Sequence, residues 1–144
     1  MRQQVLGSDD RPFGLGLRIS RQAADQLAHG ETLDRFRDEL TAAGMYAFTV
    51  NGFPYGTFHG QAVKESVYRP DWRSDQRRDY TCLLADLLAR LLPDGVPGSI
   101  STVPGSYRPW ITTETDEHRM AENLAHVALH CHRLRERTGR DVNI

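Results

Sequence analysis

Short strand-like segments alternate with amphipathic helical patterns along the 144 residues, and this alternation constrains the fold more than any other feature. Strand patterns occur at 13–20, 47–50, 99–103 and 141–144, and helical patterns at 21–28, 32–43, 74–91 and 116–138. Strands that alternate with helices in this way are typical of a parallel sheet with helices packed outside it. The length suits one domain, so we predict a single α/β domain over residues 1–144.

Residues at the expected helix ends support these boundaries. Ser20 and Thr32 are suited to cap the first and second helices, and Ser74 begins the third. Gly44 and Gly139 stand where a glycine commonly follows the last helical residue. Most of the expected helices therefore have a local signal at one or both ends.

Irregular segments rich in aromatic residues follow the second and third strands. Five of the ten Phe and Tyr residues lie between positions 48 and 68, together with Lys64, the only lysine. The segment after the third strand contributes Tyr107 and Trp110. Because α/β folds bind ligands at the carboxyl ends of their strands, we expect both segments on one face, where they could share a pocket. The alternative is that the rings plug the end of a barrel or pack against a partner.

Composition argues against several functional classes. Eighteen basic and 19 acidic residues give a net charge of −1, which favours neither nucleic acid nor a membrane surface as partner. No apolar run approaches the roughly 20 residues of a membrane helix, and the N-terminus lacks the apolar core of a secretory signal. We therefore expect a cytoplasmic protein without membrane insertion. Cys82 and Cys131 fall among apolar residues of helical patterns, which favours core packing.

The number of units points to a barrel that is only partly present in this sequence. A (β/α)8 barrel usually needs about 250 residues, whereas three βα units and the start of a fourth strand are visible here. Such a sheet would have unpaired edges and an uncovered apolar face, so we expect marginal stability and self-association through the open edges. A small doubly wound domain is the alternative.

Four segments resemble a single family. In chain order they read RPFGLGLRIS, TVNGFPYGTFHG, VKESVYRPDW and GSISTVPGSYRPW. They resemble the EboE-type metabolite traffic proteins of the xylose isomerase-like TIM-barrel superfamily, and the match runs from residue 11 to about residue 139. The resemblance implies a partial (β/α)8 TIM barrel, incomplete at both ends, with about three βα units, parallel strands and outer helices. It also implies a small polyol or sugar-like ligand in secondary-metabolite precursor biosynthesis or traffic.

The same resemblance bears on metal binding. In the wider superfamily, the carboxylate and histidine metal ligands lie mostly on later strands than those visible here. We therefore expect any divalent metal ion of the complete protein to be held by those later strands, and none to be bound by these residues. His126 and His130 are spaced as zinc-binding histidines can be, but they lack an intervening glutamate and lie on a helix expected outside the barrel.

Candidate site residues come from the strand ends and the segments that follow them. His59 could act as an acid or base, and Lys64 could hold an anionic group or work at a lowered pKa, so both are candidates for catalysis. Candidates for substrate binding offer rings, amides or hydroxyls: Asn51, Phe53, Tyr55, Tyr68, Trp72, Ser101, Thr102 and Trp110. Structural alternatives remain open, namely a turn for Asn51, loop packing for the rings and a backbone hydrogen bond for His59.

Arg69 has two interpretations. Its guanidinium could hold a phosphate or carboxylate of a ligand. Alternatively, it could form a salt bridge with Asp71 that pins the loop, and the sequence slightly favours this second interpretation.

The resemblance implies a sugar isomerase- or epimerase-like barrel protein that acts on or carries a small sugar-like metabolite. If the complete protein is an enzyme, we expect a proton transfer assisted by a divalent metal, with this part alone inactive. A non-catalytic binding or traffic module is the first alternative. A metal-dependent hydrolase of the same superfamily, such as the endonuclease IV relatives, is a weaker one because the charge balance counts against it.

Overall fold

The computed structural model describes residues 11–53, 55–56 and 64–144. Within these ranges, four parallel strands form one sheet in the order β1-β2-β3-β4. The strands are β1 (Phe13–Arg18), β2 (Met45–Asn51), β3 (Gly98–Ser101) and β4 (Val142–Asn143). The α-helices are α2 (Arg21–Ala28), α3 (Thr32–Ala42), α4 (Asp75–Leu91) and α5 (Glu114–Thr138), and two short 3-10 turns are η1 (Lys64–Tyr68) and η2 (Arg108–Trp110). The predicted α/β fold with an all-parallel sheet is therefore confirmed.

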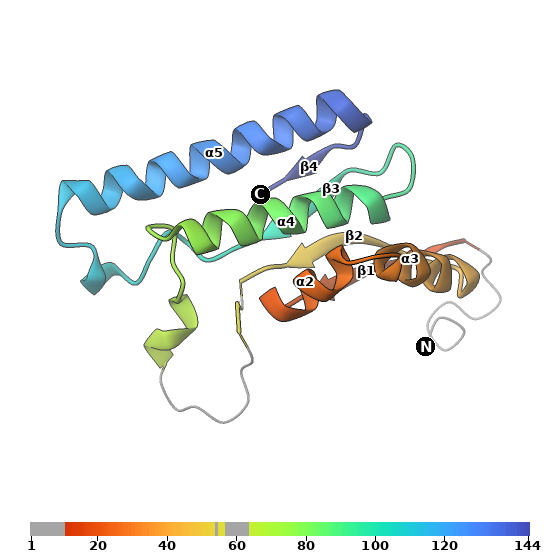
Figure 1. The fold of residues 1–144 in the computed structure, drawn as a ribbon, viewed down its shortest axis with the longest axis horizontal. Coiled ribbons are helices and arrows are strands. Elements are labelled where there is room, and N and C mark those ends of the chain that lie inside the picture. The colour runs from red at the N-terminus through yellow and green to blue at the C-terminus, as the bar shows by residue number, and fades with distance from the viewer. Residues whose placement is uncertain (1–10, 54, 57–63) are drawn as a thin grey trace.

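The α-helices gather on one face of the sheet (Figure 1). Helix α4 contacts β2, β3 and β4, and it also touches α2, α3 and α5. A doubly wound domain would carry helices on both faces and reverse its strand order. The described strands instead follow one another in sequence, so the doubly wound alternative is not what the structure shows.

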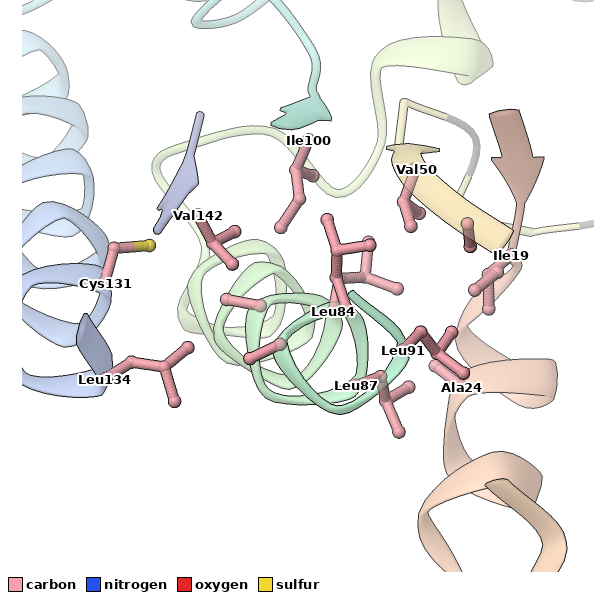
Figure 2. Close-up of a cluster of buried hydrophobic side chains, with 14 of the residues drawn as sticks. Ile19, Ala24, Val50, Leu84, Leu87, Leu91, Ile100, Cys131, Leu134 and Val142 are labelled. Carbon is pink, nitrogen blue, oxygen red and sulfur yellow. The ribbon is translucent and has the colours of Figure 1, made fainter. Parts of the chain in front are cut away.

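The core lies between the sheet and α4. Val50, Ile100 and Val142 come from three neighbouring strands and point toward α4, where Leu84 faces them, whereas Leu87 projects from the other side of α4 (Figure 2). All five side chains are buried. Strand residues with the opposite alternation point away from the helices, so the apolar side chains of the sheet concentrate on a single face.

The opposite face of the sheet, which we call the open face, carries small and polar side chains together with the rings of Tyr46 and Phe48, whose centres lie 6.3 Å apart. The Ser99 hydroxyl donates to Thr49 Oγ1 at 2.8 Å, and the Thr49 hydroxyl donates to the Ser99 carbonyl at 3.1 Å. Phe48 is 40% exposed on this face. A Cβ at Gly14 would lie 3.0 Å from the Phe48 ring, so the glycine leaves room for that ring. No described element covers this face.

Helix ends follow the sequence signals, with one exception. The Ser20 and Ser74 side chains cap α2 and α4 by accepting backbone N–H bonds, as predicted. Gly139 follows α5 with φ of 71°, a conformation that favours glycine. Thr32 was predicted as a cap, but it is the first residue of α3. Glu31 occupies the cap position and makes no side-chain capping bond there.

Helix α5 begins two residues earlier than its apolar pattern predicts. Thr113 and Asp116 form a capping box, in which each side chain accepts a hydrogen bond from the other's backbone N–H. The helix can therefore start at Glu114. Neither α5 nor any other described helix combines the length and apolar character needed to cross a membrane.

Candidate functional site

Aromatic side chains join the two irregular segments at the carboxyl ends of β2 and β3. The rings of Phe53 and Tyr68 meet edge to face at 6.0 Å between centres. The ring centres of Tyr68 and Tyr107 lie 5.7 Å apart, and those of Tyr107 and Trp110 lie 5.4 Å apart. We call Phe53, Tyr68, Tyr107 and Trp110 the aromatic row. It confirms that the two segments lie together at one end of the sheet, where η1 and η2 are also found (Figure 1).

Arg69 ends the aromatic row. Its guanidinium carbon lies 4.4 Å from the centre of the Trp110 ring, within the range of a cation–π contact. Among the described residues, no carboxylate lies within ion-pair distance of Arg69. The expected salt bridge with Asp71 is therefore wrong, because Asp71 pairs with Arg73 instead.

An open cavity of about 640 Å³ lies at the Arg69 end of the aromatic row. Most of its lining residues have polar or charged side chains, and they come from the end of the first segment, the start of α4 and the first turn of α5. The lining residues are Arg69, Pro70, Asp71, Arg73, Ser74, Gln76 and Asp116.

Asp71 is almost fully buried and ties the two segments together. It accepts hydrogen bonds from Arg73 Nη2 at 2.8 Å and from the Ser106 hydroxyl at 2.5 Å. Burial alone would raise the pKa of Asp71, but the bonds from Arg73 and Ser106 outweigh burial and hold that pKa below its ordinary value. Asp71 therefore carries a full negative charge at neutral pH, compensated by Arg73.

Arg73 extends the same network to α5. Its Nη1 donates to the Trp110 carbonyl at 2.8 Å and to Asp116 Oδ1 at 3.2 Å. Hydrogen bonds from the Thr112 backbone, the Thr113 hydroxyl and Arg73 lower the pKa of Asp116 to about 2. Both carboxylates of the cavity are thus ionised at neutral pH, and both are bound to Arg73.

Arg77 on α4 binds the backbone of the segment that follows β2. The sequence did not indicate this role. The side chain is fully buried. It donates to the backbone carbonyls of Pro70, Gly52 and Phe53 at 2.8, 2.7 and 3.1 Å. Burial lowers the pKa of Arg77, but an arginine remains charged at neutral pH. Its carbonyl partners carry no sequence signature, so no motif could have indicated this role.

Two predicted substrate-binding residues lie at the strand ends with polar groups available. Asn51 and Ser101 are exposed on adjacent strands and pair in register. Asn51 Oδ1 accepts from the Phe53 backbone N–H at 3.0 Å, which is the turn role left open by the sequence. No described residue accepts a bond from the Asn51 amide nitrogen, so Asn51 can serve the turn and still donate to a ligand.

The other substrate-binding candidates differ in accessibility. Tyr55 is half-buried against Tyr80 at 5.1 Å. Trp72 is fully buried and donates to the Val103 carbonyl at 2.9 Å, so the structure places it in the core and not on a ligand-accessible wall. The Thr102 hydroxyl is buried without a hydrogen-bond partner among the described residues.

The two catalytic candidates fall at the limits of what the structure describes. His59 lies outside the described residues, and Lys64 is the first residue of η1, with its side chain outside the described part.

Within the described ranges, no group of three or more His, Cys, Asp and Glu side chains could hold a metal. His130 Nε2 instead lies 2.9 Å from Asp86 Oδ1, between α5 and α4.

Comparisons with protein-family models, curated proteins and solved structures found no match to this chain.

Proposed function

We propose that the chain forms consecutive βα units of a xylose isomerase-like TIM barrel and binds a small polyol or sugar-like metabolite. Parallel strands in sequential order with helices on one face support the barrel, because consecutive barrel units have this arrangement. The EboE-like motifs support the family and its ligand class.

The observation that carries the ligand proposal is the aromatic row beside the strand ends. Aromatic rings provide flat apolar walls, and a few convergent polar groups fix the orientation of a ligand. Here Tyr68 and Tyr107 join the two segments, while Asn51 and Ser101 present an amide and a hydroxyl at neighbouring strand ends. Amides and hydroxyls both donate and accept, which suits a ligand with many hydroxyl groups.

A polyol titration tests this site with a matched pair of variants. Ligand-observed NMR would follow binding of xylitol and D-xylose to the wild type, Ser101→Ala and Ser99→Ala. Both serines lie on β3 and are exposed, but only Ser101 is at the carboxyl end. We expect Ser101→Ala to weaken binding about threefold to tenfold and Ser99→Ala to leave it unchanged. Equal effects of the two substitutions, or no binding to the wild type, would sink the proposal.

For the chemistry, we propose an isomerase- or epimerase-like proton transfer, with a binding or traffic role as the second candidate. We assign the rings, Asn51 and Ser101 to binding and positioning, and His59 and Lys64 remain the candidates for the proton transfer. Incubation of the complete barrel with aldoses and ketoses in D2O, in the presence of a divalent metal ion, distinguishes the two candidates. Deuterium at the carbon next to the carbonyl indicates proton transfer, whereas binding without exchange favours the traffic role.

A further inference from the structure

Arg69 stands between the aromatic row and the cavity. The cation–π contact with Trp110 holds its guanidinium over the ring without using any of its N–H donors. The residue is exposed, and no described carboxylate pairs with it. Exposed arginines are common on protein surfaces, but this one is oriented by a ring and lines a cavity.

The other charges of the cavity are already paired with one another. The lining holds the guanidiniums of Arg69 and Arg73 and the carboxylates of Asp71 and Asp116. Both carboxylates accept from Arg73. Each also accepts from a hydroxyl, which is Ser106 for Asp71 and Thr113 for Asp116. Arg69 is therefore the one charged group of the lining that has no opposite charge assigned to it within the described residues.

We propose that the ligand carries one anionic group, a carboxylate or a phosphate, and that Arg69 binds this group at the end of the aromatic row. The planar guanidinium matches both groups because it can donate two parallel hydrogen bonds to either. The cavity volume of about 640 Å³ is within the usual range for small-ligand sites. Asn51 and Ser101 do not line this cavity, so the anionic group would lie at the Trp110 end of the aromatic row. The inference rests on the proposed function, since it adds an acidic group to the ligand proposed there.

Three ligands with one carbon skeleton test the inference on the whole chain. Calorimetric titrations at low salt would use D-glucitol, D-gluconate and D-glucitol 6-phosphate, which are neutral, carboxylated and phosphorylated. We expect one or both anions to bind about tenfold more tightly than D-glucitol. The anion with the larger gain identifies the group as carboxylate or phosphate.

Two substitutions localise the effect. Arg69→Gln should remove the advantage of the anion, so that neither D-gluconate nor D-glucitol 6-phosphate binds more tightly than D-glucitol. Arg108→Gln removes the same charge from η2, outside the cavity lining, and should keep the advantage. Arg69→Lys should keep only part of it, because lysine retains the charge but loses the planar fork. Circular dichroism of each variant checks that the fold is intact.

The outcomes separate this inference from the proposed function. Equal binding of the three ligands by the wild type would overturn the anionic group while the polyol site stands. An anion advantage that survives in Arg69→Gln would overturn the role of Arg69. Failure of D-glucitol and of both anions to bind would overturn the proposed function together with this inference.

Discussion

The Arg77 guanidinium on α4 lies 2.7 Å from the carbonyl oxygen of Gly52, the first residue after β2. The same guanidinium also reaches the carbonyls of Phe53 and Pro70, so one buried cation anchors both ends of the described segment after β2. The aromatic row depends on this anchor, because Phe53 and Tyr68 belong to that segment.

Replacing Arg77 by methionine should destabilise the protein by about 3 kcal/mol, because one buried and two partly buried carbonyls lose their donor. Chemical unfolding monitored by circular dichroism would measure the loss. Arg78→Met is the matched control on the next helical position, where the side chain pairs at the surface with Asp75 and Asp79. We expect that control to cost at most about 1 kcal/mol. Similar losses for the two variants would contradict the anchoring role.

Gly52 should not tolerate a side chain. A Cβ there would lie 2.6 Å from Leu84 Cδ1 and 3.3 Å from the Ser101 carbonyl. Gly52→Ala should therefore lower the free energy of unfolding by about 1–3 kcal/mol through overpacking. Gly56→Ala serves as control, since a Cβ at Gly56 meets no atom of the described residues within 4 Å. The prediction fails if both variants unfold at the same denaturant concentration.

Stability should fall in acid partly through Asp116. Its pKa drops from an ordinary 3.8 to about 2 on folding, with hydrogen bonds from Thr112 and Thr113 as the leading causes. A group with a depressed folded pKa stabilises above its unfolded pKa and loses this contribution as pH falls through the folded value. Asp116 should therefore contribute fully above about pH 5, and the contribution should disappear toward pH 2.

The measurement compares unfolding free energies of the wild type and Asp116→Asn between pH 2 and pH 6. The two curves should converge at the acidic end and separate as pH rises. Glu117→Gln removes a carboxylate from the same helical turn but leaves the capping box intact, so its curve should keep the acid dependence of the wild type. A constant offset between wild type and Asp116→Asn at every pH would contradict the assignment.

We further predict self-association through the open face and the edges of the sheet. Phe48 is exposed on that face, and β1 and β4 have no partner on their outer edges among the described residues. Sedimentation should show an average mass that rises with concentration, and Phe48→Ser should reduce the rise. Leu129→Ser, which removes an exposed apolar side chain from α5, is the control. A mass that stays monomeric across the concentration range would disprove the association.

Much of the fold was predictable because its signals are local. Apolar alternation located the strands, Ser20 and Ser74 marked helix starts, and Gly139 marked a helix end. The prediction that Thr32 caps α3 was wrong. The helix already begins at Thr32, and the preceding residue, Glu31, occupies the cap position. The sequence could also have predicted that α5 begins at Glu114, since Thr113 and Asp116 have the spacing of a capping box.

The candidate site was less predictable because its contacts join residues far apart in the sequence. Asp71 has an arginine two positions away on either side, at Arg69 and Arg73, so spacing could not decide between them. The structure assigns Arg73 because Arg69 lies against Trp110, which belongs to another loop. Catalysis by His59 and Lys64 stays a prediction.

The two tryptophans of the chain occupy opposite environments, and this gives the protein two intrinsic optical reporters. Trp72 is sealed in the core with its indole N–H bonded to Val103, so its emission should be blue-shifted and inaccessible to iodide. Trp110 is half-buried in the aromatic row against Arg69, so a soluble quencher can reach it. Quenching thus reports on the loops while the protected emission reports on the core, and a single unlabelled sample can distinguish loosening of the loops from global unfolding.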